Sequence, residues 1–75
     1  MQELIEYIAK SLASKPDAVK VTSEMEEDHM VLKLEVDPED KGRIIGRQGR
    51  VAQAMRTLLR VAAIKDGTRV ILEIV

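Results

Sequence analysis

Cysteine is absent from this 75-residue chain, and Tyr7 is its single aromatic residue. Without cysteine the chain has neither a disulfide framework nor a thiolate metal site. Modules of the RNA-recognition-motif and OB-fold classes stack bases on aromatic rings, so a chain with one ring is a poor candidate for either class. No apolar run approaches the ~20 residues that would cross a bilayer. These absences exclude several common architectures.

The N-terminal segment lacks the features of a secretory signal. MQELIEYIAK carries acidic residues where a signal peptide carries basic ones, and no small-residue cleavage site follows. We therefore expect a cytoplasmic protein. With 45% hydrophobic and 33% charged residues, the composition is typical of a globular domain. A chain of this length is expected to form one domain over residues 1–75.

The formal net charge is only −1, but the charges are unevenly distributed along the chain. Residues 1–40 contain eleven acidic and four basic residues, whereas residues 41–60 contain six basic residues and no acidic one. Such segregation predicts a basic surface for a polyanion, and the alternative is a chance cluster on a solvated helix face. The six basic residues are Lys41, Arg43, Arg47, Arg50, Arg56 and Arg60.

Hydrophobic periodicity predicts two strands after a first helix. Apolar residues at positions 4, 5, 8 and 12 have helical spacing, and Pro16 lies just beyond the end of that helix. Residues 19–25 and 30–36 alternate between apolar and polar side chains on either side of a short polar turn. This pattern is typical of an antiparallel hairpin with one buried face.

The second half of the chain predicts two helices and a last strand. Asp37-Pro38 begins a short helix that Gly46 interrupts, and a longer helix runs from about residue 50 to residue 65, before Gly67. Residues 69–75 alternate as a strand, which must return across both helices and so favours a parallel partner. The expected fold is α+β, with the order α-β-β-α-α-β and three helices on one face of a three-stranded mixed sheet. The apolar face predicted for the longer helix consists of Val51, Met55, Leu58, Leu59 and Ala62.

The segment between the two later helices carries the chemistry. Gly46 and Gly49 permit a sharp turn and let bare N–H groups approach a ligand. The next helix begins at once, so its first N–H groups add donors and a partial positive charge. Arg47 and Arg50 supply guanidinium groups, and Gln48 supplies an amide. We predict that this corner binds a run of phosphates.

These residues, in this context, resemble the KH domain. Ile44-Ile45 followed by Gly46-Arg47-Gln48-Gly49 is similar to the signature of that family, and the predicted element order is similar to its type II, bacterial topology. The resemblance covers essentially the whole chain. The short stand-alone form, with an arginine-rich helix after the loop, is similar to the small bacterial proteins of the KhpA family.

The resemblance implies a protein that binds single-stranded RNA, with about four nucleotides in a groove. The phosphate clamp would be Gly46, Arg47, Gln48 and Gly49, with Arg43 and Arg50 beside it and Ile44, Ile45 and Val51 near the floor of the groove. For the three apolar residues, packing in the core is the alternative. The implied roles are those of an RNA chaperone or post-transcriptional regulator, with links to the cell envelope and cell shape.

A protein-interaction module is the second hypothesis. The resemblance implies a homodimer, or a heteromer with a larger KH-containing protein of the KhpB (Jag) type. The residues themselves favour the same class, because the last helix and strand have apolar residues beyond those that a core needs. These additional residues are Ala54, Val61, Ala63, Ile64, Ile71 and Val75.

No catalytic, metal or cofactor site is predicted. The serines have no histidine at a plausible spacing, and the glycines match neither the dinucleotide fingerprint nor the phosphate loop of nucleotide hydrolases. His29 lies in the hairpin turn beside Glu27 and Asp28, where the ligands and geometry of a metal site are missing.

Overall fold

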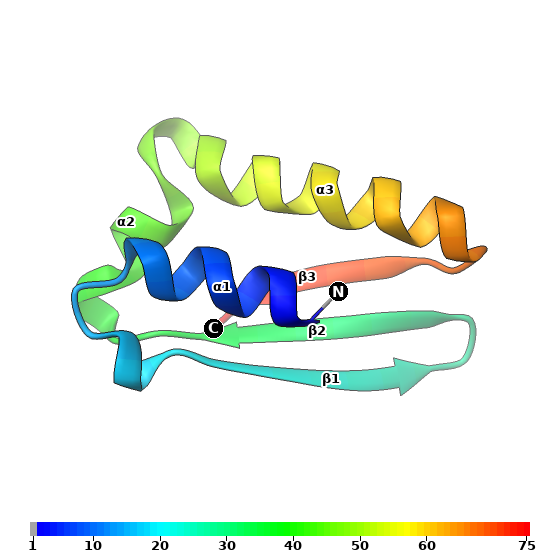
Figure 1. Ribbon diagram of the computed structural model, residues 1–75, viewed down its shortest axis with the longest axis horizontal. Helices are drawn as coiled ribbons and strands as arrows, with labels where there is room; N and C mark the ends of the chain where they lie inside the picture. Colours follow the sequence, from blue (N-terminus) through cyan, green and yellow to red (C-terminus); the bar gives the residue numbers. More distant parts are fainter. Residues whose placement is uncertain (1) are drawn as a thin grey trace.

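The computed structural model describes residues 2–75, and the predicted single domain is therefore described from Gln2 onward (Figure 1). The order α-β-β-α-α-β is confirmed. The main elements are α1 (Gln2–Leu12), β1 (Lys20–Glu26), β2 (His29–Glu35), α2 (Lys41–Ile45), α3 (Arg50–Asp66) and β3 (Val70–Ile74). Three single-turn 3-10 helices complete the described chain: η1 (Pro16–Ala18), η2 (Pro38–Asp40) and η3 (Arg47–Gly49).

The sheet is mixed, with the strand order β1-β2-β3. β1 and β2 form the predicted antiparallel hairpin, with Val21 opposite Leu34. β3 pairs with β2 in parallel and places Ile74 on the other side of Leu34, which confirms the predicted crossover. β3 is consequently an edge strand, and the backbone groups along its outer side have no strand partner in the described sheet.

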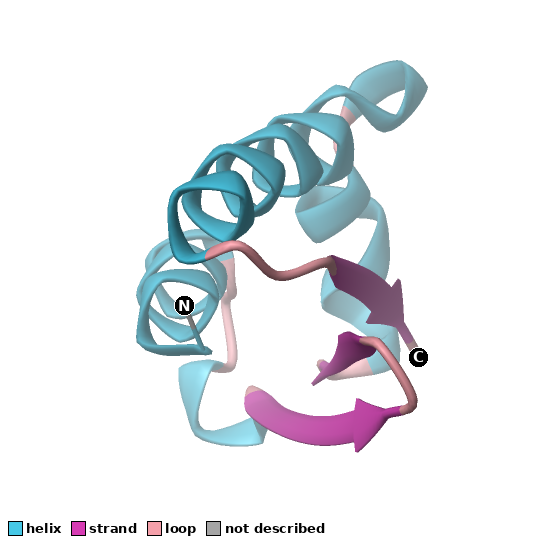
Figure 2. Cartoon of the chain, turned by 90° about the vertical axis from the view of Figure 1, so that its right-hand side faces the viewer, coloured by secondary structure: helices cyan, strands magenta, loops and turns pink. Residues whose placement is uncertain are grey.

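The helices cover one face of the sheet, as predicted (Figure 2). Side chains from α1, α2, α3 and all three strands meet between these layers and lose almost all contact with solvent. Removing this much apolar surface from water is the main term that stabilises a small domain. The largest fully buried apolar side chains are Ile5, Leu32, Leu34, Ile44, Met55 and Leu59.

Three details of the predicted core are wrong. Leu58 is 47% exposed, because α3 turns its Met55–Leu59 line toward the sheet and the next residue along a helix points about 100° away. Ala63 is buried on that same line, although the sequence suggested a surplus surface residue. Met25 was expected on the buried face of β1 but is 72% exposed. The hairpin tip, where β1 ends, extends past the N-terminal end of α1 (Figure 1).

The two ends of the molecule carry different connections. The corner between α2 and α3 lies at one end, while the β1–β2 turn and the α3–β3 loop lie together at the other (Figure 1). The longest dimension is 34 Å, and α3 runs along most of it. Of the helices described over residues 2–75, none has the length and apolar character needed to span a membrane.

Candidate nucleic-acid interface

The corner between α2 and α3 is a tight backbone turn. α2 ends at Gly46, whose N–H donates to the carbonyl of Gly42 at 2.8 Å. Gly46 has φ 80° and ψ 171°, a conformation that is essentially restricted to glycine. Gln48 (φ 58°) and Gly49 (φ 73°) follow in the left-handed region. Three positive φ values within four residues reverse the chain and expose its backbone.

Gly46 is required by space as well as by backbone angle. A Cβ atom at this position would lie 2.5 Å from Cγ2 of Val51 and 2.9 Å from the backbone nitrogen of Val51. A Cβ at Gly49 would meet nothing within 4 Å. The two glycines of the loop therefore differ: Gly46 allows the start of α3 to lie against the corner, whereas Gly49 only relaxes the backbone.

One local hydrogen bond and three from the loop after α1 fix the segment that leads into α2. The carboxylate of Asp37 accepts from the N–H of Glu39 at 2.9 Å, as the predicted helix cap. Asp40, which is 1% exposed, accepts from the hydroxyl of Ser14 at 2.7 Å and from the N–H groups of Ser14 and Lys15 at 3.1 Å. The Ser14 hydroxyl is the main cause that lowers the pKa of Asp40, which is therefore ionised at neutral pH.

The polar side chains predicted at the corner all lie on its surface. Arg43, Arg47, Gln48 and Arg50 are exposed, and Nη2 of Arg50 donates to Oε1 of Gln48 at 3.4 Å. No side chain caps the first turn of α3, which begins beside the exposed guanidinium groups of Arg47 and Arg50. This arrangement presents backbone donors, a helix N-terminus and positive charge to the same space, as phosphate binding requires.

The three apolar residues predicted near the groove occupy different environments. Ile44 has no exposed surface and packs in the core, so the expectation that it lies on the groove floor is corrected in favour of the packing alternative. Ile45 is 38% exposed, and Val51 is half-buried with its methyl group against Gly46. Only Ile45 and Val51 therefore remain available to a ligand at the corner.

The resemblance implied a groove for nucleotides, but its position between α3 and the edge strand β3 was not specified by the sequence. A pocket of about 200 Å³ lies there, walled by Arg56 and Arg60 on α3 and by residues 70–72 of β3. Arg56 and Arg60 are four residues apart, so they lie on one flank of the helix, and this spacing is the signal available in the sequence. The surface predicted as basic thus extends from the corner along α3.

The described residues offer no metal centre. Within residues 2–75, no three or more His, Cys, Asp and Glu side chains gather in a way that could hold an ion. The acidic side chains of β1 and the hairpin turn instead form ion pairs, such as Glu24 with Lys33 at 3.5 Å.

Comparison with known proteins finds a matching family model. The family model described as the KH domain of KhpA/KhpB matches residues 2–74. The chain belongs to this KH-domain family. The assignment confirms the resemblance read from the residues of the corner and from the element order.

Curated relatives in this KH-domain family are similar to the chain over almost their full length. Proteins named RNA-binding protein KhpA are 49% identical in Clostridium perfringens (all of both chains), 51% in Borreliella burgdorferi (96% of this chain, 88% of the relative) and 43% in Aquifex aeolicus (99% and 94%). These names describe binding proteins and not enzymes, in agreement with the sequence analysis. No solved structure was found to match the chain.

Proposed function

We propose that this KH-domain protein binds single-stranded RNA, with the corner from Gly46 to Gly49 holding phosphates and the α3–β3 groove receiving bases. The observation that carries the proposal is the uncapped start of α3 beside the exposed side chains of Arg47 and Arg50. The names of the full-length relatives give independent support. RNA as the ligand also implies a cytoplasmic location.

A single strand fits the groove better than a duplex does. Bases that are not paired can turn into a groove and hydrogen-bond through their edges, whereas the bases of a duplex are stacked inside it. The free backbone groups along the outer side of β3 are available to such edges. The aliphatic wall formed by Val70 and Ile71 can receive base faces without an aromatic ring.

The decisive experiment places two carboxylates at the corner. The double variant Arg47→Asp/Gln48→Asp should abolish binding of a fluorescein-labelled single-stranded RNA, measured by anisotropy, because like charges then face the phosphates. Both side chains are exposed, and aspartate tolerates the left-handed conformation of residue 48, so the fold should persist.

A matched control separates local charge from net charge. The double variant Lys20→Glu/Thr22→Glu makes the same change in net charge at exposed positions of β1, the sheet edge farthest from the groove. It should retain most of the affinity. Equal losses in both double variants, or unchanged affinity in the corner variant, would contradict a phosphate clamp at residues 46–49.

The cellular role that we propose is RNA chaperoning or post-transcriptional regulation, with an effect on the cell envelope and cell shape. Binding dominated by phosphates carries little sequence information, and a regulator or chaperone that acts on many transcripts needs little. Crosslinking in cells, followed by sequencing of the recovered RNA, tests this role. Recovery of one structured RNA alone would argue for a dedicated complex instead.

We also propose that the protein associates with a second KH-containing chain, either its own copy or a larger partner of the KhpB type. On α3, Ala54, Leu58 and Val61 follow one another at spacings of four and three and form an exposed apolar stripe. Arg56 and Arg60 lie on the other flank of the helix, so a partner on the stripe leaves the groove open.

Light scattering tests the association of copies. The variant Leu58→Glu should lower the mass of a dimer to that of a monomer, because it introduces a charge at the centre of the stripe. Met25→Glu is the control, since Met25 is 72% exposed but lies at the hairpin tip. A monomeric wild-type protein at high concentration would leave the larger partner as the one candidate for this stripe, to be tested by copurification.

A further inference from the structure

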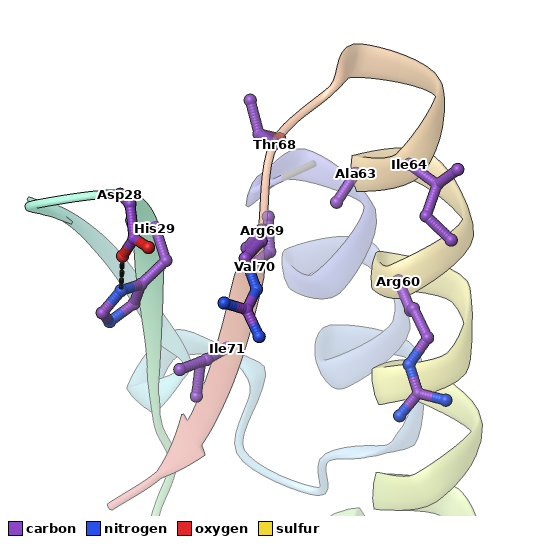
Figure 3. Close-up of a pocket in the computed structure, with 9 residues that line it drawn as sticks. All are labelled: Asp28, His29, Arg60, Ala63, Ile64, Thr68, Arg69, Val70 and Ile71. Atoms are coloured by element: carbon purple, nitrogen blue, oxygen red, sulfur yellow. Dashed lines mark hydrogen bonds and ion pairs between the residues drawn. The ribbon is translucent and has the colours of Figure 1, made fainter.

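A further pocket lies at the end of the molecule opposite the corner (Figure 3). Its volume is about 560 Å³, within the range of roughly 300–1,000 Å³ that is typical of small-ligand sites. The last turns of α3, the loop after it and the first residues of β3 form most of the wall. The β1–β2 turn supplies Asp28 and His29 on the other side of β3 (Figure 3).

This pocket continues the groove between α3 and β3. The smaller α3–β3 pocket shares Arg60, Val70 and Ile71 with it. At a rise of about 1.5 Å per residue, Arg60 lies roughly 15 Å along α3 from Arg50. A strand that is held at the corner and follows α3 therefore reaches the pocket with nucleotides beyond the clamped phosphates.

The pocket combines the three kinds of surface that an unpaired nucleotide needs. Ile64 and Ile71 are 70% and 49% exposed and offer apolar surface to a base face. Arg60 and Arg69 project guanidinium groups from opposite walls, where they can stack on a base or contact a phosphate (Figure 3). Asp28 is the one carboxylate among the residues that line the two described pockets.

Neighbouring side chains orient the carboxylate of Asp28. Nδ1 of His29 lies 3.1 Å from Oδ1 of Asp28, and Nε2 of the same ring lies 3.3 Å from Oε2 of Glu26. The hydrogen bond with His29 is the main cause that lowers the pKa of Asp28. The Asp28 side chain is nevertheless 73% exposed, so it is an ionised acceptor with one oxygen, Oδ2, left for a ligand.

We propose that this pocket receives the base at the far end of the bound RNA segment, and that Asp28 selects bases with an exocyclic amino group over uracil. A carboxylate accepts hydrogen bonds and donates none, so it pairs with the amino group of adenine, cytosine or guanine. Uracil presents carbonyl oxygens in the equivalent positions, which a carboxylate repels. The proposal rests on the RNA binding proposed above.

Two eight-nucleotide RNAs, oligocytidine and oligouridine, test the role of the exocyclic amino group. Their rings are of the same size, so the two RNAs differ mainly in the hydrogen-bonding edge of the base. The wild-type protein should bind oligocytidine roughly three- to tenfold more tightly, as expected for the net contribution of one hydrogen bond at an exposed site. Asp28→Asn should bring the ratio of the two dissociation constants close to one. Glu27→Gln is the matched control, since it removes the same charge from the same turn outside the pocket and should leave the ratio unchanged.

The outcomes separate this proposal from RNA binding itself. A wild-type protein without preference, or a preference that survives Asp28→Asn, overturns the base-selecting pocket while loss of binding in the corner variant still supports the phosphate clamp. Unchanged affinity in the corner variant overturns the clamp, whatever the ratio. Amide NMR shifts of Asp28 and Thr68 during the oligocytidine titration should be large, and shifts confined to the corner would also overturn the pocket.

Discussion

Alanine substitutions at three glycines, residues 42, 46 and 49, measure how much stability depends on the backbone and the close packing at the corner. Gly46→Ala puts a Cβ atom 2.5 Å from the Val51 methyl group and forces a backbone conformation restricted to glycine. The backbone strain costs about 1–3 kcal/mol, and the crowding adds about 1–3 kcal/mol. This total is a large part of the 4–11 kcal/mol, roughly, that holds a domain of this size folded.

The other two glycines supply the comparison. Gly49→Ala meets no atom within 4 Å and should cost only about 1–2 kcal/mol for its left-handed backbone. Gly42 lies inside α2 with open space around its Cα, so Gly42→Ala should stabilise the domain by about 0.5–1 kcal/mol through helix propensity.

Urea denaturation followed by circular dichroism gives the three free energies of unfolding. The expected order of stability is Gly42→Ala, wild type, Gly49→Ala, Gly46→Ala. RNA affinity, measured well below each midpoint, should fall most for Gly46→Ala, because Val51 and the start of α3 must move away from the corner. A Gly46→Ala protein as stable as Gly42→Ala would refute the close approach of Val51 to the corner.

Three further predictions concern packing, pH and salt. Leu59→Ala should lower the free energy of unfolding by about 2–5 kcal/mol in urea titrations, whereas the exposed Leu58→Ala should change it far less. The pKa of Asp40 is lower in the folded state than its unfolded value of ~3.9. The ionised carboxylate therefore stabilises the fold above that pH, and this stabilisation is lost as pH falls through the folded pKa. The urea midpoint of wild type should drop more steeply below pH ~4 than that of Asp40→Asn. If the corner neutralises ~3 phosphates, the log–log salt slope is roughly −2, and anisotropy should show about 20-fold weaker RNA binding in 200 mM than in 50 mM KCl.

Local signals in the sequence predicted most of the fold correctly. Asp37-Pro38 begins a helical turn and Gly67 ends α3 in the left-handed conformation, because caps act within a few residues of the chain. The parallel pairing of β3 followed from the handedness of crossovers. The sharp turn at the corner was predicted from Gly46 and Gly49, because the backbone freedom of glycine also acts locally.

What the sequence did not predict depends on distant contacts. The role of Asp40 requires Ser14, 26 residues earlier, and no periodicity connects the two. The groove at Arg56 and Arg60 exists because β3 lies beside one flank of α3. Leu58 and Leu59 are adjacent and chemically identical, so only the orientation of α3 over the sheet decides which one is buried.

These distant contacts also explain why the corner is suited to binding. The buried carboxylate of Asp40 joins the start of α2 to the loop after α1, and Val51 packs against Gly46 from the other side. Both contacts form during folding, before any ligand arrives. A phosphate strand therefore meets donors that are already placed, and binding needs to order little of the protein. Removal of the Asp40 carboxylate should accordingly weaken RNA binding at the corner, although Asp40 is 1% exposed and does not need to touch RNA.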